Sequence, residues 1–110
     1  MSEQTADPAV IPDNTQSVTK ILSHAWVAHV KGDHATAESE FSKVLESDPD
    51  STDALYGYGL TQKMLGNKEK AIVSFQKALD ILAKEANTEK SSRVPMLRYL
   101  TQSQLKLLSE

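Results

Sequence analysis

The fold is decided by two copies of one pattern, GDHATAESEFSKVLESDP at residues 32–49 and GNKEKAIVSFQKAL at residues 66–79. The two copies coincide when the sequence is shifted by 34 residues. The shift pairs Gly32 with Gly66, Asp33 with Asn67, Ala37 with Ala71, Phe41 with Phe75, Lys43 with Lys77 and Leu45 with Leu79, and upstream Ile21 with Leu55 and Ala25 with Gly59. A repeat of this length holds two helices and a turn, and it buries its apolar face only by stacking on a neighbour.

Capping residues and helix-ending residues divide the two repeats into four predicted helices. The helix starts are marked by Asp13 with Gln16, and by Asp33, Ser51 and Asn67. The ends are marked by Gly32, by Asp48 with Pro49, and by Gly66. The resulting helices cover about residues 15–31, about 34–47, the stretch from Ser51 to Gly66, and a stretch that begins after Asn67.

Residues 32–49 resemble the second half of a tetratricopeptide repeat, and Gly66 to Leu79 resembles a second copy. The resemblance covers about residues 18–84 and implies an all-α, right-handed solenoid of two helix-turn-helix repeats, about 18–51 and 52–86. These repeats belong to a domain over residues 15–110, preceded by a disordered segment over residues 1–14. The family usually has a proline where this chain has Ala83, which predicts a fourth helix that continues to Ala86 or Asn87.

A fifth helix is predicted over about residues 93–109, with Pro95 in its first turn. Its apolar stripe is formed by Leu97, Leu100, Gln104, Leu107 and Leu108. The helix resembles the capping helix that closes such arrays, and two repeats are fewer than the roughly three that an independent solenoid normally needs. We therefore expect it to cover the fourth helix. The alternative is that it is the first half of a third repeat.

The composition is that of a globular helical chain and excludes several classes of protein. No cysteine is present, so a disulfide framework, a cysteine nucleophile and a thiolate zinc site are excluded. The formal charge of −3 divides into −7 over residues 1–53 and +4 over residues 54–110, a polarity that orients charged partners. We find neither a signal peptide nor a stretch of about 20 apolar residues that could span a membrane, and we expect a cytoplasmic protein.

No group of residues has a pattern that predicts catalysis, a metal or a cofactor, so we expect a chain that is not an enzyme. His24 and His29 are separated by about 140° on a helix, and His34 lies beyond the Gly32 turn. Glu38 and Glu40 have no orienting partner and are interpreted as a solvated face. The basic residues carry no interleaved aromatics, which argues against a nucleic-acid partner.

Two glycines in the third helix do not form a phosphate-binding loop, because they lie mid-helix and follow no strand. Gly59 is explained by close helix packing. Gly57 has no evident structural reason in the sequence, and it should cost about 1 kcal/mol in helix propensity.

The first helix of each repeat is apolar over a wider arc than packing alone requires. In the helix over about residues 15–31, a second apolar stripe is formed by Leu22, Trp26 and Val30. In the helix from Ser51 to Gly66, the corresponding stripe is formed by Tyr56, Leu60 and Met64. In tetratricopeptide folds these helices line a concave groove. The resemblance places eight residues there: Leu22, Trp26, His29, Val30, Tyr56, Leu60, Lys63 and Met64. Aromatic residues and methionine in a preformed apolar surface are typical binding anchors.

The expected function is therefore non-catalytic binding of a peptide or helix of another protein, with an acidic flank favoured by the basic C-terminal half. One alternative is homo-oligomerisation, as a homodimer or scaffold, through the same surface. Another is that the extra stripe is covered by the fifth helix or by the N-terminal segment. Some family members bind the C-terminal carboxylate of a chaperone with polar and basic side chains. This sequence has Leu22, Trp26 and Gly57 at three of those positions, so this kind of binding is not expected.

Overall fold

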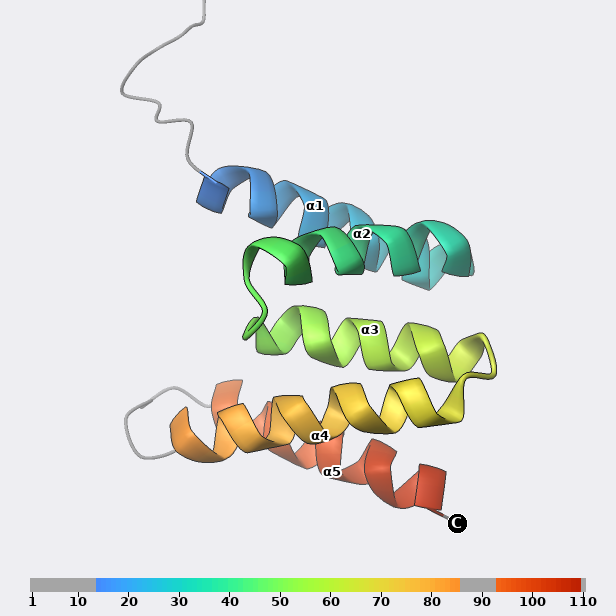
Figure 1. Ribbon diagram of the computed structural model, residues 1–110, viewed down its shortest axis with the longest axis vertical. Coiled ribbons are helices and arrows are strands. Elements are labelled where there is room, and N and C mark those ends of the chain that lie inside the picture. Colours follow the sequence, from blue (N-terminus) through green and yellow to red (C-terminus); the bar gives the residue numbers. More distant parts are fainter. Residues whose placement is uncertain (1–13, 86–92, 110) are drawn as a thin grey trace, which may run out of the picture.

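The computed structural model describes residues 14–85 and 93–109, and in these ranges the chain forms helices joined by short turns, with no strand (Figure 1). The helices are α1 (Asn14–Lys31), α2 (His34–Ser47), α3 (Thr52–Met64), α4 (Lys68–Glu85) and α5 (Arg93–Ser109). The all-α repeat fold predicted from the sequence is confirmed. The segment over residues 1–13 and the predicted cap at Asp13 lie outside the described residues.

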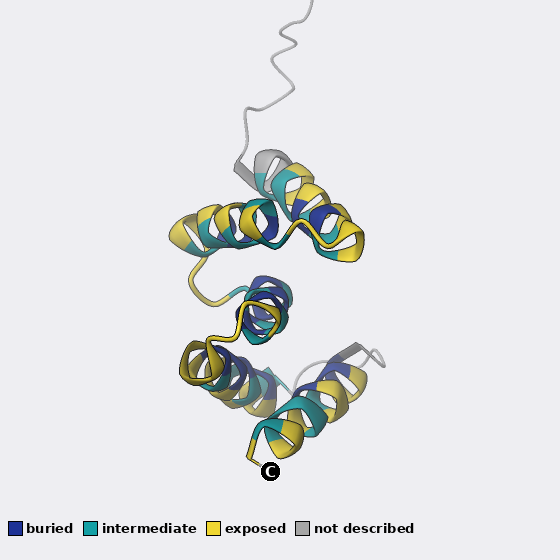
Figure 2. Cartoon of the chain, turned by 90° about the vertical axis from the view of Figure 1, so that its right-hand side faces the viewer, coloured by how far each residue is buried: buried dark blue, intermediate teal, exposed yellow. Residues whose placement is uncertain are grey.

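Consecutive helices pack side by side along the chain. α1 contacts α2, α2 contacts α3, α3 contacts α4 and α4 contacts α5, and α1 also contacts α3. Seen along the helices, α2 and α4 lie on one side and α1 and α5 on the other, with α3 between them (Figure 2). We call the side formed by α1 and α5 the inner face and the side formed by α2 and α4 the outer face.

The helix ends lie where the capping pattern predicts them. Asp33 accepts a hydrogen bond from the Thr36 amide at 3.2 Å, and Ser51 accepts one from the Ala54 amide at 3.2 Å. These bonds satisfy amides that have no partner within the helix. Gly32 and Gly66 have φ angles of 84° and 86°, the left-handed conformation that ends α1 and α3. α4 runs past Ala83 to Glu85, and its predicted continuation to Ala86 or Asn87 lies outside the described residues.

Two phenylalanine rings end against two glycines of α3. A methyl group at Gly57 would lie closer than 3.0 Å to three ring atoms of Phe41, and one at Gly59 would lie equally close to the ring of Phe75. Both rings are fully buried. Gly57 therefore has a structural reason, contrary to the sequence interpretation, because the ring from α2 occupies the space of its missing side chain. Gly59 serves the close packing that was predicted.

The buried stripe of α5 differs from the predicted one. Val94, Leu97 and Thr101 are buried, whereas Leu100 is 37% and Leu107 is 57% exposed. Thr101 tolerates burial because its hydroxyl donates to the Leu97 carbonyl at 2.7 Å. The prediction of Leu100 and Leu107 in the stripe was wrong because it gave leucines priority and left out Thr101, whose hydroxyl finds a hydrogen-bond partner within its own helix.

Polar side chains connect neighbouring helices, and these include the two glutamates interpreted as a solvated face. Gln62 is fully buried, donates to Glu38 of α2 at 2.7 Å and accepts from Asn67 at 2.8 Å. Glu40 lies 3.0 Å from His24 and 3.0 Å from Lys43. Its hydrogen bonds with these two residues hold the pKa of the Glu40 carboxyl below its usual value. The solvated-face interpretation of Glu38 and Glu40 was wrong.

Replacing Gly57 by alanine tests the contact with Phe41. Alanine favours the helix by up to about 1 kcal/mol, but its methyl group overpacks the core at a cost of about 1–3 kcal/mol. We expect Gly57→Ala to lower the free energy of unfolding, measured by chemical denaturation, by about 1–2 kcal/mol. Adding Phe41→Leu should recover part of this loss. Ser39→Ala, at an exposed position of α2, is the control and should change stability by less than about 0.5 kcal/mol. A more stable Gly57→Ala variant would contradict the packing account.

Candidate protein-interaction surface

The eight predicted groove residues lie on α1 and α3, which contact each other. Val30 is 82% exposed and Met64 is 58% exposed. The remaining six are half-buried: Leu22, Trp26, His29, Tyr56, Leu60 and Lys63. The structure therefore divides the predicted set into two freely exposed apolar side chains and six that also contact the protein itself.

Trp26 is the centre of an aromatic cluster that joins the two repeats. Its ring centroid lies 5.0 Å from that of Phe41 at an interplanar angle of 80°, and 5.8 Å from that of His29 at 86°. The ring of Tyr56 lies 6.4 Å away on α3. Edge-to-face pairs at these distances are favourable. Trp26 thus presents part of its surface to solvent while another part packs on the core.

Helix α5 contributes a side chain that the groove prediction did not include. Gln104 accepts a hydrogen bond from the Lys63 ammonium at 2.7 Å, and it also hydrogen bonds with the Tyr56 side chain. Tyr56 packs against the buried cluster of Leu82, Val94 and Leu97. Burial raises the pKa of the Tyr56 hydroxyl, and its hydrogen bond with Gln104 opposes that rise. Tyr56 and Lys63 are therefore engaged by α5.

The exposed part of α1 forms a shallow apolar depression of about 300 Å³, lined by Trp26, Val27, Val30 and Lys31. Two of these, Val27 and Lys31, were absent from the predicted groove. Val27 is 49% exposed. The signal for it was present in the sequence, since valine follows Trp26 directly and lies three residues before Val30, on the same side of a helix. We call Trp26, Val27, Val30 and Met64 the inner patch.

His29 borders the inner patch, with its ring centroid 5.8 Å from that of Trp26, and its surroundings shift its pKa. Burial lowers the pKa of the His29 imidazole, and the neighbouring His34 lowers it further. The two ring centroids are 6.4 Å apart, and the Nδ1 atoms of both rings are buried with no hydrogen-bond partner among the described residues. The folded protein therefore favours the neutral imidazole more than the unfolded chain does.

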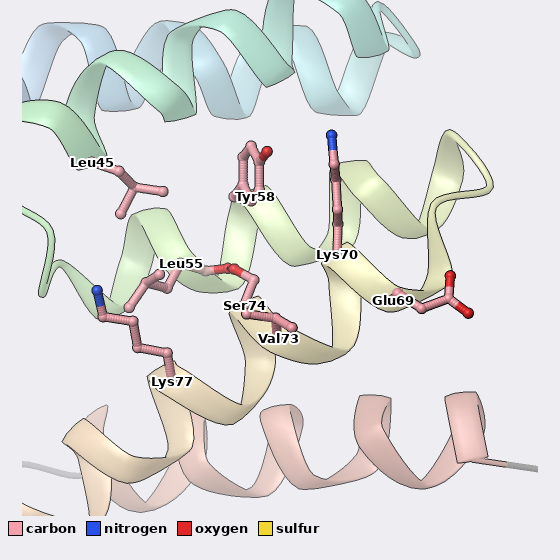
Figure 3. A pocket seen from close by; sticks show the side chains of 8 residues that line it. All are labelled: Leu45, Leu55, Tyr58, Glu69, Lys70, Val73, Ser74 and Lys77. Atoms are coloured by element: carbon pink, nitrogen blue, oxygen red, sulfur yellow. The ribbon is translucent and has the colours of Figure 1, made fainter.

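A second hollow of about 380 Å³ opens on the outer face between α2, α3 and α4 (Figure 3). Its lining residues are Leu45, Leu55, Tyr58, Glu69, Lys70, Val73, Ser74 and Lys77. The sequence analysis assigned no role to this face. The hollow could not be seen in the sequence because its lining comes from three different helices. We call it the outer pocket.

Within residues 14–85 and 93–109, no group of three or more histidine or acidic side chains is placed to hold a metal ion. In the same part of the chain, no helix has the length and apolar character needed to cross a membrane.

Helix pairs stacked side by side along the chain define a helical-repeat protein. The tetratricopeptide repeat family model matches residues 40–73, which run from α2 through α3 into α4. The match confirms the resemblance noted in the sequence and supports the assignment of the chain to the tetratricopeptide repeat family. No curated protein and no solved structure matches the chain significantly. Members of this family are in general non-catalytic repeats that mediate protein–protein interactions.

The two roles of Trp26 can be separated by comparing it with Phe41. Phe41→Ala deletes a fully buried ring and should lower the free energy of unfolding by about 3–5 kcal/mol. Trp26→Ala removes a half-buried ring and should cost less, about 1–2 kcal/mol, with helix content retained. Chemical denaturation followed by circular dichroism measures both. If Trp26→Ala is as destabilising as Phe41→Ala, the tryptophan is wholly a core residue and is not part of an inner-face surface.

The lowered pKa of His29 makes stability depend on pH in a defined direction. The folded state binds this proton less well than the unfolded state does, so the contribution is present above the ordinary histidine pKa of about 6.5 and is lost as the pH falls below it. We expect NMR titration to place the His29 midpoint below that value. His34→Gln should raise the midpoint only in part, because burial is the larger cause. A His29 midpoint at or above the ordinary value would contradict this account.

Proposed function

We propose that the chain is a non-catalytic interaction module that binds a peptide or helix of another protein on its inner face. The observation that carries the proposal is the inner patch, in which Val30 lies beside the half-buried ring of Trp26 and exposes 82% of its surface, and Met64 on α3 exposes 58%. Exposed apolar side chains near a partly exposed aromatic ring are the usual anchors of a protein interface. The family's general role in protein–protein interaction agrees with this reading.

The charges of the helices favour an acidic flank on the partner. The inner-face helices α1 and α5, together with α3 between them, carry six Lys or Arg residues and one acidic residue, Asp53. The six are Lys20, Lys31, Lys63, Arg93, Arg98 and Lys106. On the outer face, α2 carries three glutamates and one lysine, and α4 carries four lysines and three acidic residues. A partner with carboxylates near its apolar anchors is therefore attracted and oriented toward the inner face.

The division into repeats belongs to the same proposal. We assign the first repeat to residues 18–51, the second to 52–86, and the role of a capping helix to α5. This assignment is supported by the packing of Val94 and Leu97 of α5 against Leu82 of α4. A cap covers the apolar surface that the last repeat of an array otherwise exposes. Reading α5 as the first half of a third repeat is the alternative.

The inner patch is tested by placing charge on its exposed apolar residues. The double variant Val30→Glu with Met64→Glu should reduce recovery of specific partners by at least about tenfold in affinity capture with the full chain and quantitative mass spectrometry. Its unfolding free energy should stay within about 0.5 kcal/mol of the wild type, because both side chains are exposed. Ala35→Glu with Ser39→Glu, at exposed positions of α2 on the outer face and outside the outer pocket, adds the same charge, is the matched control and should retain those partners. Equal recovery by the wild type and the double variant would remove the inner face from the proposal.

Self-association through the inner patch is the competing function. It is separated from partner binding by sedimentation of the full chain at several concentrations and two salt levels. Self-association is favoured if the mass of the wild type rises with concentration while the mass of the double variant stays at the monomer value. A monomer at all concentrations leaves partner binding as the function of the patch.

A further inference from the structure

The outer pocket is an apolar surface that the fold leaves open. Leu55 at its base is 5% exposed, and Leu45 and Tyr58 on its walls are half-buried. Val73 on its rim is 68% exposed and adds to the apolar surface open to solvent. The pocket volume of about 380 Å³ is within the range of natural ligand sites, about 300–1,000 Å³. This surface lies opposite the inner patch and is independent of it.

The polar groups that a ligand would meet at this pocket are donors and cations. Figure 3 shows the ammonium groups of Lys70 and Lys77 on either side of the opening, whereas the carboxylate of Glu69 points away. The Ser74 hydroxyl is already used, since it donates to the Leu55 carbonyl at 2.6 Å. Lys77 lies 4.0 Å from Asp50 in an exposed pair, which is weak enough to be exchanged for another carboxylate.

The two lysines also determine how far apart the carboxylates of a complementary ligand must lie. Lys70 and Lys77 are seven residues apart on α4, so they lie on the same side of the helix and about 10 Å apart along its axis. Val73 lies between them. A complementary ligand places an apolar side chain over Val73 and Leu55 and a carboxylate toward each lysine. An amphipathic helix with acidic residues two turns apart has this arrangement.

Outside the pocket face itself, no helix of a second copy of the described chain supplies that combination. Its large exposed apolar side chains outside the pocket lie on α1, at the end of α3 and on α5. α1 and α5 contain no acidic residue, and the single acidic residue of α3, Asp53, is at the far end of that helix from Met64. Charge complementarity therefore favours a different protein as the occupant.

We propose that the outer pocket is a second protein-binding site, which takes an amphipathic segment of a partner in which an apolar side chain is flanked by two carboxylates. The apolar side chain enters between Leu45, Leu55 and Val73. The carboxylates pair with Lys70 and Lys77, which set the orientation of the segment. The two faces of the molecule then bind two different partner segments.

The probe for this site is a displayed library of randomised, helix-forming peptides, selected on the immobilised full chain and counter-selected on Lys70→Glu with Lys77→Glu. Peptides that prefer the wild type should carry Asp or Glu on both sides of an apolar residue. Their Kd should rise at least about tenfold for the counter-selection variant and for Val73→Glu. It should stay within about twofold for Lys68→Glu with Lys84→Glu, which makes the same charge change at exposed positions of α4 outside the pocket lining, and for the inner-patch double variant.

Charge reversal gives the most stringent readout. Replacing the carboxylates of a selected peptide by lysines should abolish binding to the wild type and restore it to the Lys70→Glu with Lys77→Glu variant. The proposal is overturned if no peptide distinguishes the two proteins, if the selected peptides lack the acidic and apolar pattern, or if the control lysine pair matters equally. It is also overturned if the lysine reversal abolishes self-association in sedimentation, since a second copy then occupies the pocket. The proposal is overturned too if the Val10→Asp with Ile11→Asp variant of the full chain binds the peptides more tightly than the wild type does. The chain's own N-terminal segment would then compete with the peptides for the outer pocket.

Discussion

Helix α3 is held between two phenylalanine rings, and the whole stack depends on the absence of side chains where those rings end. Phe41 reaches Gly57 from the first repeat, and Phe75 reaches Gly59 from the second. Glycine weakens a helix by about 1 kcal/mol relative to alanine, so two glycines within three residues are a local cost that tertiary packing offsets. The rings approach one helix from both neighbours, and the two repeats are thereby joined into one core.

Around that core, polar side chains fix how each helix sits on the next. Gln62 connects α3 to Glu38 of α2 and to the turn before α4, and Ser74 of α4 donates to a carbonyl of α3. These bonds are directional, whereas the surrounding apolar contacts are not. The arrangement leaves two surfaces of different character. The inner patch projects from α1 and α3, and the outer pocket is a hollow above α3.

Much of the fold could be predicted from local signals, and less of the site. The helix ends follow from Asp33, Ser51 and the two left-handed glycines, because capping is a property of a few neighbouring residues. The contact of Gly57 with Phe41 could not be predicted, since it depends on how far one helix is rotated against another. The same limit applies to Gln104, whose role at Tyr56 and Lys63 requires the placement of α5. Val30 and Met64 were found because a wide apolar arc is visible in the sequence alone, and their role as binding anchors remains a proposal.

Gln104 gives the inner face a built-in coupling. Its side chain hydrogen bonds with Lys63 and Tyr56 of α3, so a ligand that drew either side chain out of this position would loosen the contact between α3 and α5. For such a ligand, binding on the inner face and docking of α5 would oppose each other by the same free energy. A segment that extends the array beyond α5 would change what the inner face binds without touching it.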